Sequence, residues 1–301
     1  FDISSDGFFW AFDQYPDGSQ AWASNEADVI YMATDNGAPG GDYMLAVMAH
    51  EFQHLIQFNT DQNEASWVNE GLSELAMWLF GHPDNISGFT SNTDNNLTSW
   101  GGAWADYIKV YLWTLYMYEQ YGGHDLISDV SHNPINGMEG YRTSLEHLGL
   151  SPDMGDIFRD WNLANFLHDT SIEDGRYGYS GETLPLFWAS RIHTSSPVDE
   201  TTGTISGWAG ESIRLLDAIT PLHLTFDGMD TSDFRVTVSS RAPSMPTLVR
   251  HLDLDEFNRG VIPLRYLYNE AVLSVSNVNS SVNASYSYST LVMPVVSVPE
   301  I

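Results

Sequence analysis

The stretch from Ala49 to Glu74 constrains the fold most, because histidine and glutamate recur in it at helical spacing. His50 and His54 are four residues apart, so a helix places both imidazoles on one face, about one turn from each other. Apolar residues at helical spacing are expected to form the buried face of this helix: Leu45, Met48, Phe52, Leu55 and Ile56. The sequence predicts a helix that Asp42 caps and that runs to about Asn59.

The first part of this stretch, H-E-F-Q-H at residues 50–54, matches the H-E-x-x-H pattern. Two imidazoles at this spacing suit a single zinc ion that lies about 2.0–2.1 Å from each nitrogen. Bound zinc lowers the pKa of a water on its open position toward about 7, and Glu51 can take the proton of that water. The chain has no cysteine, so histidine and carboxylate would hold the zinc; a pair of surface histidines is the alternative.

A third zinc ligand must come from outside this motif. In the metzincin pattern glycine and histidine follow three and six residues after His54, but Gln57 and Thr60 stand there. A site of two histidines and one glutamate takes its glutamate from a following helix, where Glu70 and Glu74 share a face. One of them can ligate zinc while the other supports a ligand histidine through its second ring nitrogen.

The following helix is expected between a cap at Ser66 and a stop at Gly81 and Pro83. Gly71 lies inside it, where glycine costs roughly 1 kcal/mol relative to alanine. We therefore expect another element to pack close to the backbone at Gly71.

The run W-V-N-E-G at residues 67–71, downstream of the H-E-x-x-H motif, resembles the gluzincin metallopeptidases, which include the thermolysin-like and aminopeptidase-N-like families. The overall likeness is to secreted bacterial peptidases of the hyicolysin type and to immune-inhibitor-A-like sets. Its specific motifs cover only about Met48 to Trp78. The resemblance implies a zincin-like catalytic domain.

The resemblance also implies that Glu70 is the third zinc ligand and that Glu74 supports a zinc histidine. Fifteen residues separate His54 from Glu70, fewer than in the two best-known gluzincin families. Nineteen separate His54 from Glu74, which fits the thermolysin-like count better. We prefer Glu70 because Asn69 precedes it and because a turn between helices can vary in length, but the division of roles stays open at this point.

Peptide hydrolysis also needs a hydrogen-bond donor for the developing oxyanion. In aminopeptidase-N-like enzymes a tyrosine in a Tyr-x-Lys context provides it, and Y-I-K at residues 107–109 resembles that context, so Tyr107 is the candidate. Tyr107 and Tyr111 also recur at helical spacing, which makes a core stripe the alternative and Tyr111 a second candidate. A histidine donor, as in thermolysin-like enzymes, would come from one of four residues: His124, His132, His147 and His168.

The strand expected from Asp28 to Thr34 lacks the Gly-x-Met-Glu-Asn motif with which aminopeptidase-N-like enzymes bind a free amine. This absence favours a zinc-dependent endopeptidase that cleaves peptide or protein substrates, and the strand can offer its edge to an extended peptide. One alternative is an aminopeptidase of the same chemistry. The other is a non-proteolytic protein that contains zinc and binds a surface or a glycan.

The pattern of the chain changes about two thirds of the way along. Short apolar runs and turns fill the first forty residues, and helical patterns follow to about residue 167. From about Ile205 short branched runs alternate with turns, which predicts an all-β sandwich. We expect an α+β chain with a zincin-like domain at 1–200 and a β-sandwich domain at 205–301, divided in the Ser-, Thr-, Pro- and Gly-rich segment 195–207.

Acidic residues outnumber basic ones by 40 to 11, and the net charge is -29. Such a charge repels nucleic acid and anionic membranes, so neither is an expected partner. The absence of an apolar run of about 18 residues argues against membrane insertion. Charge and resemblance suit a secreted, extracellular protein; we expect a monomer and interpret Phe1 as the start of a processed form.

Calcium is a weaker candidate for a second cofactor, because acidic and amide side chains lie in polar loops: Asp13, Asp17, Asp94, Asn95 and Asn96. The chain has no EF-hand loop pattern. Solvated turns are therefore the favoured interpretation of these residues, and calcium binding is the alternative.

Overall fold

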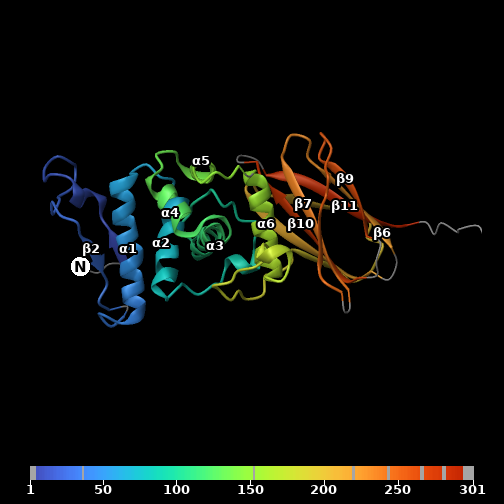
Figure 1. Cartoon of the computed structure of the whole chain (residues 1–301), viewed down its shortest axis with the longest axis horizontal. Coiled ribbons are helices and arrows are strands. Elements are labelled where there is room, and N and C mark those ends of the chain that lie inside the picture. Colours follow the sequence, from blue (N-terminus) through green and yellow to red (C-terminus); the bar gives the residue numbers. More distant parts are fainter. Residues whose placement is uncertain are drawn as a thin grey trace, which may run out of the picture. The chain divides into compact units, whose positions relative to one another are not determined.

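The structure is a computed structural model that describes residues 5–35, 37–151, 153–218, 221–242, 245–264, 268–279 and 283–293. By their contacts the residues divide into two compact units, one of Phe1–Gly88 and Leu97–Pro152, the other of Phe89–Asn96 and Asp153–Ile301. Helices and mostly antiparallel sheets together confirm the α+β class at this level (Figure 1). Within the described residues, every helix is too short or too polar to cross a bilayer.

The first unit, here the helical unit, begins with a two-stranded antiparallel sheet of β1 (Gly7–Phe9) and β2 (Ile30–Met32). Its helices are α1 (Asp42–Thr60), α2 (Ser66–Phe80), α3 (Trp104–Tyr121), α4 (Gly123–His132) and α5 (Gly137–His147). Figure 1 shows α1 between the two strands and α2, with α3 seen end-on on the other side of α2. Residues 108–117 of α3 are all buried, so this helix forms the core of the unit.

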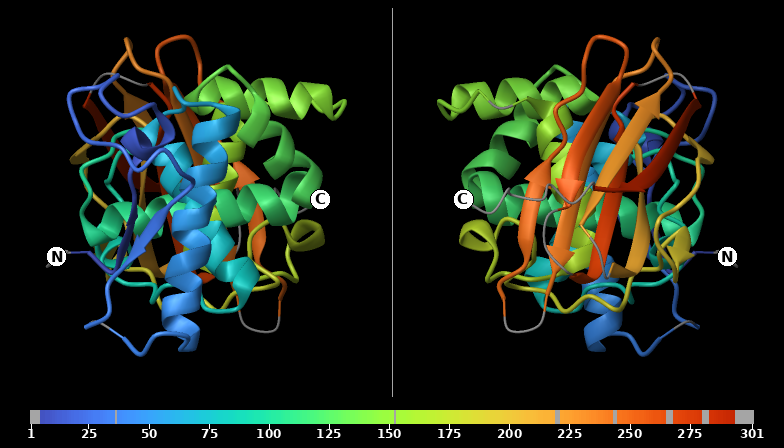
Figure 2. Two further views of the ribbon diagram at one scale, coloured as in Figure 1. Left: turned by 90° about the vertical axis from the view of Figure 1, so that its left-hand side faces the viewer. Right: turned by 90° about the vertical axis from the view of Figure 1, so that its right-hand side faces the viewer.

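The second unit, here the β unit, contains α6 (Met154–Leu167) and two sheets. One sheet has the order β3 (Arg191–His193), β5 (Ala209–Ala218), β10 (Tyr268–Asn277), β7 (Phe234–Arg241) and β8 (Leu248–His251). The other has the order β4 (Thr201–Ile205), β11 (Ala284–Val292), β6 (Leu222–Gly228) and β9 (Arg259–Leu264). Buried side chains of both sheets share one hydrophobic core, as in a sandwich. Figure 2 (right) shows the strands of this unit from the side.

Helix α6 belongs to the β unit and not to the helical unit. It packs on β5, β7 and β10, and the Asn162 amide donates a hydrogen bond to Ser276 Oγ at 3.0 Å. A Cβ atom on Gly210 would lie only 2.3 Å from the Asn162 side chain, so glycine is required there. The contacts therefore divide the chain into units at Pro152. The sequence places the domain boundary later, in the segment 195–207.

The buried face of α1 differs from the apolar stripe expected from the sequence. Met48 and Phe52 are 38% and 53% exposed, whereas Val47, His50 and Glu51 are buried. The reason is that the face of α1 toward α2 and β1 joins apolar packing of Ala46 and Val47 with Met77 to polar contacts of His50 with α2.

Gly71 of α2 lies against α3, as its position inside a helix predicts. A Cβ atom on Gly71 would lie 2.4 Å from Thr114 Oγ1 and 3.0 Å from the Val110 carbonyl oxygen. The expected close approach of another element is thus confirmed, and that element is α3.

We expect Gly71→Ala to lower the free energy of unfolding by about 1–3 kcal/mol, because the new methyl group overlaps α3. The roughly 1 kcal/mol that alanine gains in helix propensity offsets part of this loss. Urea denaturation measures the change, and Thr114→Ala in the same chain should recover some stability by removing the nearest atom. Wild-type stability of Gly71→Ala would contradict the close contact.

Glu64 connects the starts of α2 and α5. Its Oε1 accepts hydrogen bonds from the backbone N–H groups of Ala65 at 2.6 Å and Gly137 at 2.8 Å. Burial raises the pKa of Glu64 to about 7. Since the folded state holds this proton more strongly than the unfolded chain does, the stability from Glu64 is full below about pH 4.5 and is lost as the pH rises through about 7.

Glu64→Gln should therefore gain stability relative to wild type between pH 5 and pH 8, by at most about 3 kcal/mol, because glutamine cannot ionise. Urea denaturation of both proteins at the two pH values gives this difference. Glu146→Gln, the same change at an exposed position on α5, is the control and should show no such gain. If Glu64→Gln and wild type differ in stability by the same amount at pH 5 and at pH 8, the pKa of Glu64 is not raised in the folded protein.

Candidate metal centre

His50 and His54 of α1 meet Glu70 of α2 at one point. The Nε2 atoms of His50 and His54 are 3.1 Å apart. Glu70 Oε2 lies 3.5 Å from His50 Nε2 and 3.7 Å from His54 Nε2. Around a tetrahedral zinc with bonds of about 2.0–2.1 Å, donor atoms are about 3.3 Å apart. Among the described residues, this is the one group of three or more His, Asp or Glu side chains placed to hold a metal ion.

The atoms of this group fit a cation of the zinc type. Glu70 Oε2 is buried and accepts no hydrogen bond from the described residues. This oxygen faces two imidazole nitrogens, and a bound cation would give all three atoms a common partner. Two imidazoles and one carboxylate are ligands that zinc accepts, and a set of three leaves one coordination position open.

Each histidine is also held through its second ring nitrogen. Glu74 Oε1 lies 3.2 Å from His50 Nδ1. Asn69 Oδ1 and Ser73 Oγ lie 2.9 Å and 3.1 Å from His54 Nδ1. All three supports come from α2, and such contacts fix the ring orientation so that the Nε2 atoms face each other.

The two glutamates that the sequence left open occupy different places. Glu70 faces the Nε2 atoms of both histidines, whereas Glu74 faces only His50 Nδ1. Burial opposes the charged form of His50, but Glu70 and Glu74 outweigh it and raise the pKa of His50 to about 10. Burial, together with the neighbouring charge of His50, lowers the pKa of His54. Positive charge is thus favoured on the His50 ring, between the two carboxylates.

Glu51, the proposed base of the motif, lies between α1 and β1. Its carboxylate accepts a hydrogen bond from the backbone N–H of Phe9, and a Cβ atom on Gly7 would lie 3.0 Å from Glu51 Cγ. Burial raises the pKa of Glu51 to about 7, although the charge of His50 opposes the rise. The strand therefore fixes the position of this carboxylate beside the histidines.

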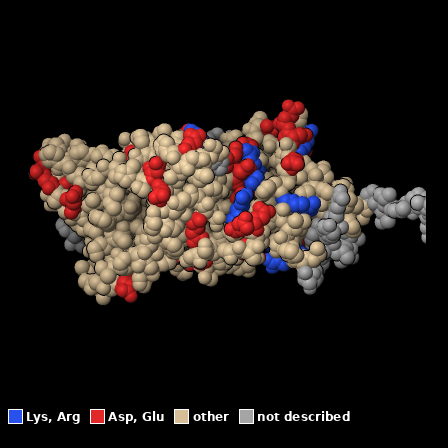
Figure 3. All heavy atoms as spheres, viewed as in Figure 1, with Lys and Arg blue, Asp and Glu red and all other residues tan. Residues whose placement is uncertain are grey.

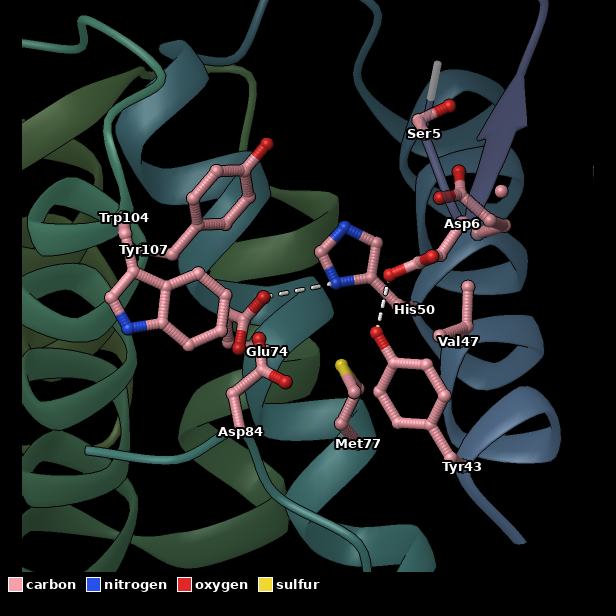
Figure 4. A pocket seen from close by; sticks show the side chains of 12 residues that line it. Ser5, Asp6, Tyr43, Val47, His50, Glu74, Met77, Asp84, Trp104 and Tyr107 are labelled. Atoms are coloured by element: carbon pink, nitrogen blue, oxygen red, sulfur yellow. Dashed lines mark hydrogen bonds and ion pairs between the residues drawn. The ribbon is translucent and has the colours of Figure 1, made fainter. Parts of the chain in front are cut away.

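A cavity of about 220 Å³ opens beside His50 and Glu51 (Figure 4). Tyr107 lines it, and the centroid of its ring lies 6.4 Å from that of His50. Burial, with the charges of Glu70 and Glu74, raises the pKa of Tyr107 to about 12, so the hydroxyl keeps its proton and can donate it in a hydrogen bond.

The other oxyanion candidates do not line this cavity. Tyr111 is completely buried in α3, and among the described residues that line the cavity His50 is the one histidine. Three of the candidate histidines are exposed on α4 and α5, and the fourth follows α6 in the β unit: His124, His132, His147 and His168.

The sequence gives no motif for several residues that line the cavity. Asp84 follows α2, Trp104 starts α3, and Tyr43 near the start of α1 donates a hydrogen bond to Asp6. Burial, with the charge of Glu74 nearby, raises the pKa of Asp84 to about 7. These side chains meet only through the packing of α1, α2 and α3, so spacing along the chain carries no signal for them.

The expected calcium ligands are engaged within the protein. The Asp13 carboxylate accepts hydrogen bonds from the Asn25 N–H and the Tyr31 hydroxyl. Asp17 accepts one from the Ser24 N–H, in the same unit. In the β unit Asp94 accepts one from the Ser206 N–H, which supports the interpretation of these residues as turns.

Glu74→Gln should weaken binding of a divalent metal such as zinc by about 10- to 100-fold, because the support of His50 loses its charge. Competition with a chromogenic chelator measures the affinity. Glu146→Gln, an exposed change of the same kind in the same unit, should bind metal as wild type does. Equal affinities of all three proteins would show that Glu74 does not support the metal centre.

No family model matches this chain, and no curated protein matches it. Among solved structures, the pre-peptidase C-terminal domain of a Bacillus anthracis collagenase is similar over 35% of this chain and 95% of its own, with 10% identity and a TM-score of 0.27. A mitogen from Yersinia pseudotuberculosis covers 33% of this chain and 88% of its own, with 15% identity and a TM-score of 0.24. A periplasmic inhibitor of g-type lysozyme from Aeromonas hydrophila covers 34% and 94%, with 15% identity and a TM-score of 0.24. These likenesses are too slight to bear on the fold or the function of this chain.

Proposed function

We propose that this chain is a secreted zinc-dependent endopeptidase and that its helical unit is a zincin-like catalytic domain. The observation that carries the proposal is the meeting of His50, His54 and Glu70 at zinc-ligand separations, with Glu51 and a cavity beside them. The net charge of -29 is in keeping with an extracellular protein. On the face that Figure 3 shows, the acidic side chains are scattered, and some basic side chains lie beside them.

His50, His54 and Glu70 would hold the zinc, which would supply a Lewis acid for the scissile carbonyl and for the attacking water. Glu51 accepts a proton from the attacking water and passes it to the leaving amine. The Tyr107 hydroxyl donates a hydrogen bond to the oxyanion that forms on the substrate. Glu74 keeps the ring of His50 in position throughout the reaction.

Two features favour catalysis over a purely structural metal site. A structural zinc is usually closed by four protein ligands, whereas the group found in the described residues has three. A structural site also has no use for a base, and Glu51 lies beside His50, held by the N–H of Phe9.

We expect Glu51→Gln to lower kcat/KM on an unfolded protein substrate by about 10²- to 10⁴-fold while zinc content stays at the wild-type level. The loss follows because glutamine has nearly the shape of glutamate but cannot accept the proton. Zinc content is measured by elemental analysis, and Glu256→Gln at an exposed position of the β unit is the control. Full activity in a zinc-loaded Glu51→Gln protein would overturn the mechanism.

A further inference from the structure

We propose that the cavity beside the metal centre binds a positively charged group of the peptide substrate, an ammonium or a guanidinium, between Asp84 and Glu74. The inference rests on the proposed peptidase function and names the substrate class of that site. Such a group has two sources in a peptide, a basic side chain and the free amino terminus.

The cavity carries charge of one sign. The described residues of its lining include four carboxyl side chains and no Lys or Arg: Asp6, Glu51, Glu74 and Asp84. These residues come from the chain before β1, from α1, from α2 and from the segment after α2, so the packing of the unit gathers them. A cleft lined by one sign of charge between low-dielectric walls attracts ligands of the opposite sign.

Glu74 has a buried oxygen that lacks a donor. Its side chain is 2% exposed; Oε1 faces His50 Nδ1, and Oε2 accepts no hydrogen bond from the described residues. Figure 4 shows Asp84 beside Glu74, where the two carboxyl groups interact. Asp84 and Glu74 share a hydrogen bond when Asp84 holds a proton. When both are ionised, each carboxylate only accepts hydrogen bonds, and a cation with several N–H donors would satisfy both.

The walls of the cavity suit the stem of a basic side chain. Val47 of α1 and Met77 of α2 offer apolar surface, along which the methylene groups of lysine or arginine can pack while the charged end reaches the carboxylates. The rings of Tyr43, Trp104 and Tyr107 also line the cavity and can interact with a cation through their faces. A substrate with an acidic side chain at this place would meet like charge.

The test compares cleavage of peptides of one sequence by the zinc-loaded full chain. One peptide has both ends blocked and contains lysine, a second has norleucine in its place, and a third has norleucine and a free amino terminus. We expect the first or the third to exceed the second by about 10- to 100-fold in kcat/KM, and the peptide that does so identifies the source of the cation. Asp84→Asn and Asp84→Ala should each reduce that ratio about tenfold or more.

Asp125→Asn is the matched control, because Asp125 is exposed in the same unit and does not line the cavity. It should leave the ratio unchanged. The comparison is repeated in about 0.5 M salt, because a net charge of -29 attracts any cationic peptide at long range and salt screens that attraction. A preference that comes from the cavity persists in salt.

Calorimetric binding of the same peptides to zinc-loaded Glu51→Gln, with and without Asp84→Asn, measures the preference without turnover. Absence of any Glu51-dependent cleavage would refute the peptidase function. The ratio of the peptide affinities measured by calorimetry would still show whether the cavity prefers a positively charged group. Cleavage or binding that does not distinguish the three peptides would overturn the charged-group assignment and leave the peptidase function intact. The charged-group assignment would also be overturned if Asp84→Asn and Asp125→Asn reduced the preference equally.

Discussion

The helical unit depends on the position of α2, because two adjacent residues of this helix contact different neighbouring helices. Glu70 faces the histidines of α1, and Gly71 lets the side chain of Thr114 and the backbone of α3 come close. Successive side chains on a helix are about 100° apart, so rotating α2 to relieve one contact breaks the other. The same rotation would also move Glu74 away from His50. Packing and metal geometry are therefore set together.

The sequence predicts the centre of the site well and its surroundings poorly. The spacing of His50 and His54 is local, and both the helix and the meeting of the imidazoles follow from it. The buried face of α1 does not follow, because an apolar stripe is a guide to burial only where apolar residues make the contacts. Here contacts between carboxylates and imidazoles occupy part of the inner face beside Ala46 and Val47, and Phe52 is left exposed. Asp84 reaches the cavity only through the folded chain.

At the level of the fold, the branched runs after Ile205 predict strands that the structure contains, because alternation along a strand is also a local signal. The assignment of α6 is not local. A helix that covers a sheet shows the same apolar spacing as a helix in a bundle, so only its partners tell the two apart. The contact of Asn162 with Gly210, between residues nearly fifty positions apart, is invisible in the sequence pattern.

The hydrogen bond from Phe9 to Glu51 couples the candidate base to a sheet of two three-residue strands. An isolated pair of strands is only marginally stable, so such a sheet opens more easily than helices packed around a buried core. The carboxylate would then lose its backbone anchor while the imidazoles stay supported by α2. Mild denaturation would thus separate two properties that coincide in the native state, the capacity to hold a metal and the capacity to move a proton beside it.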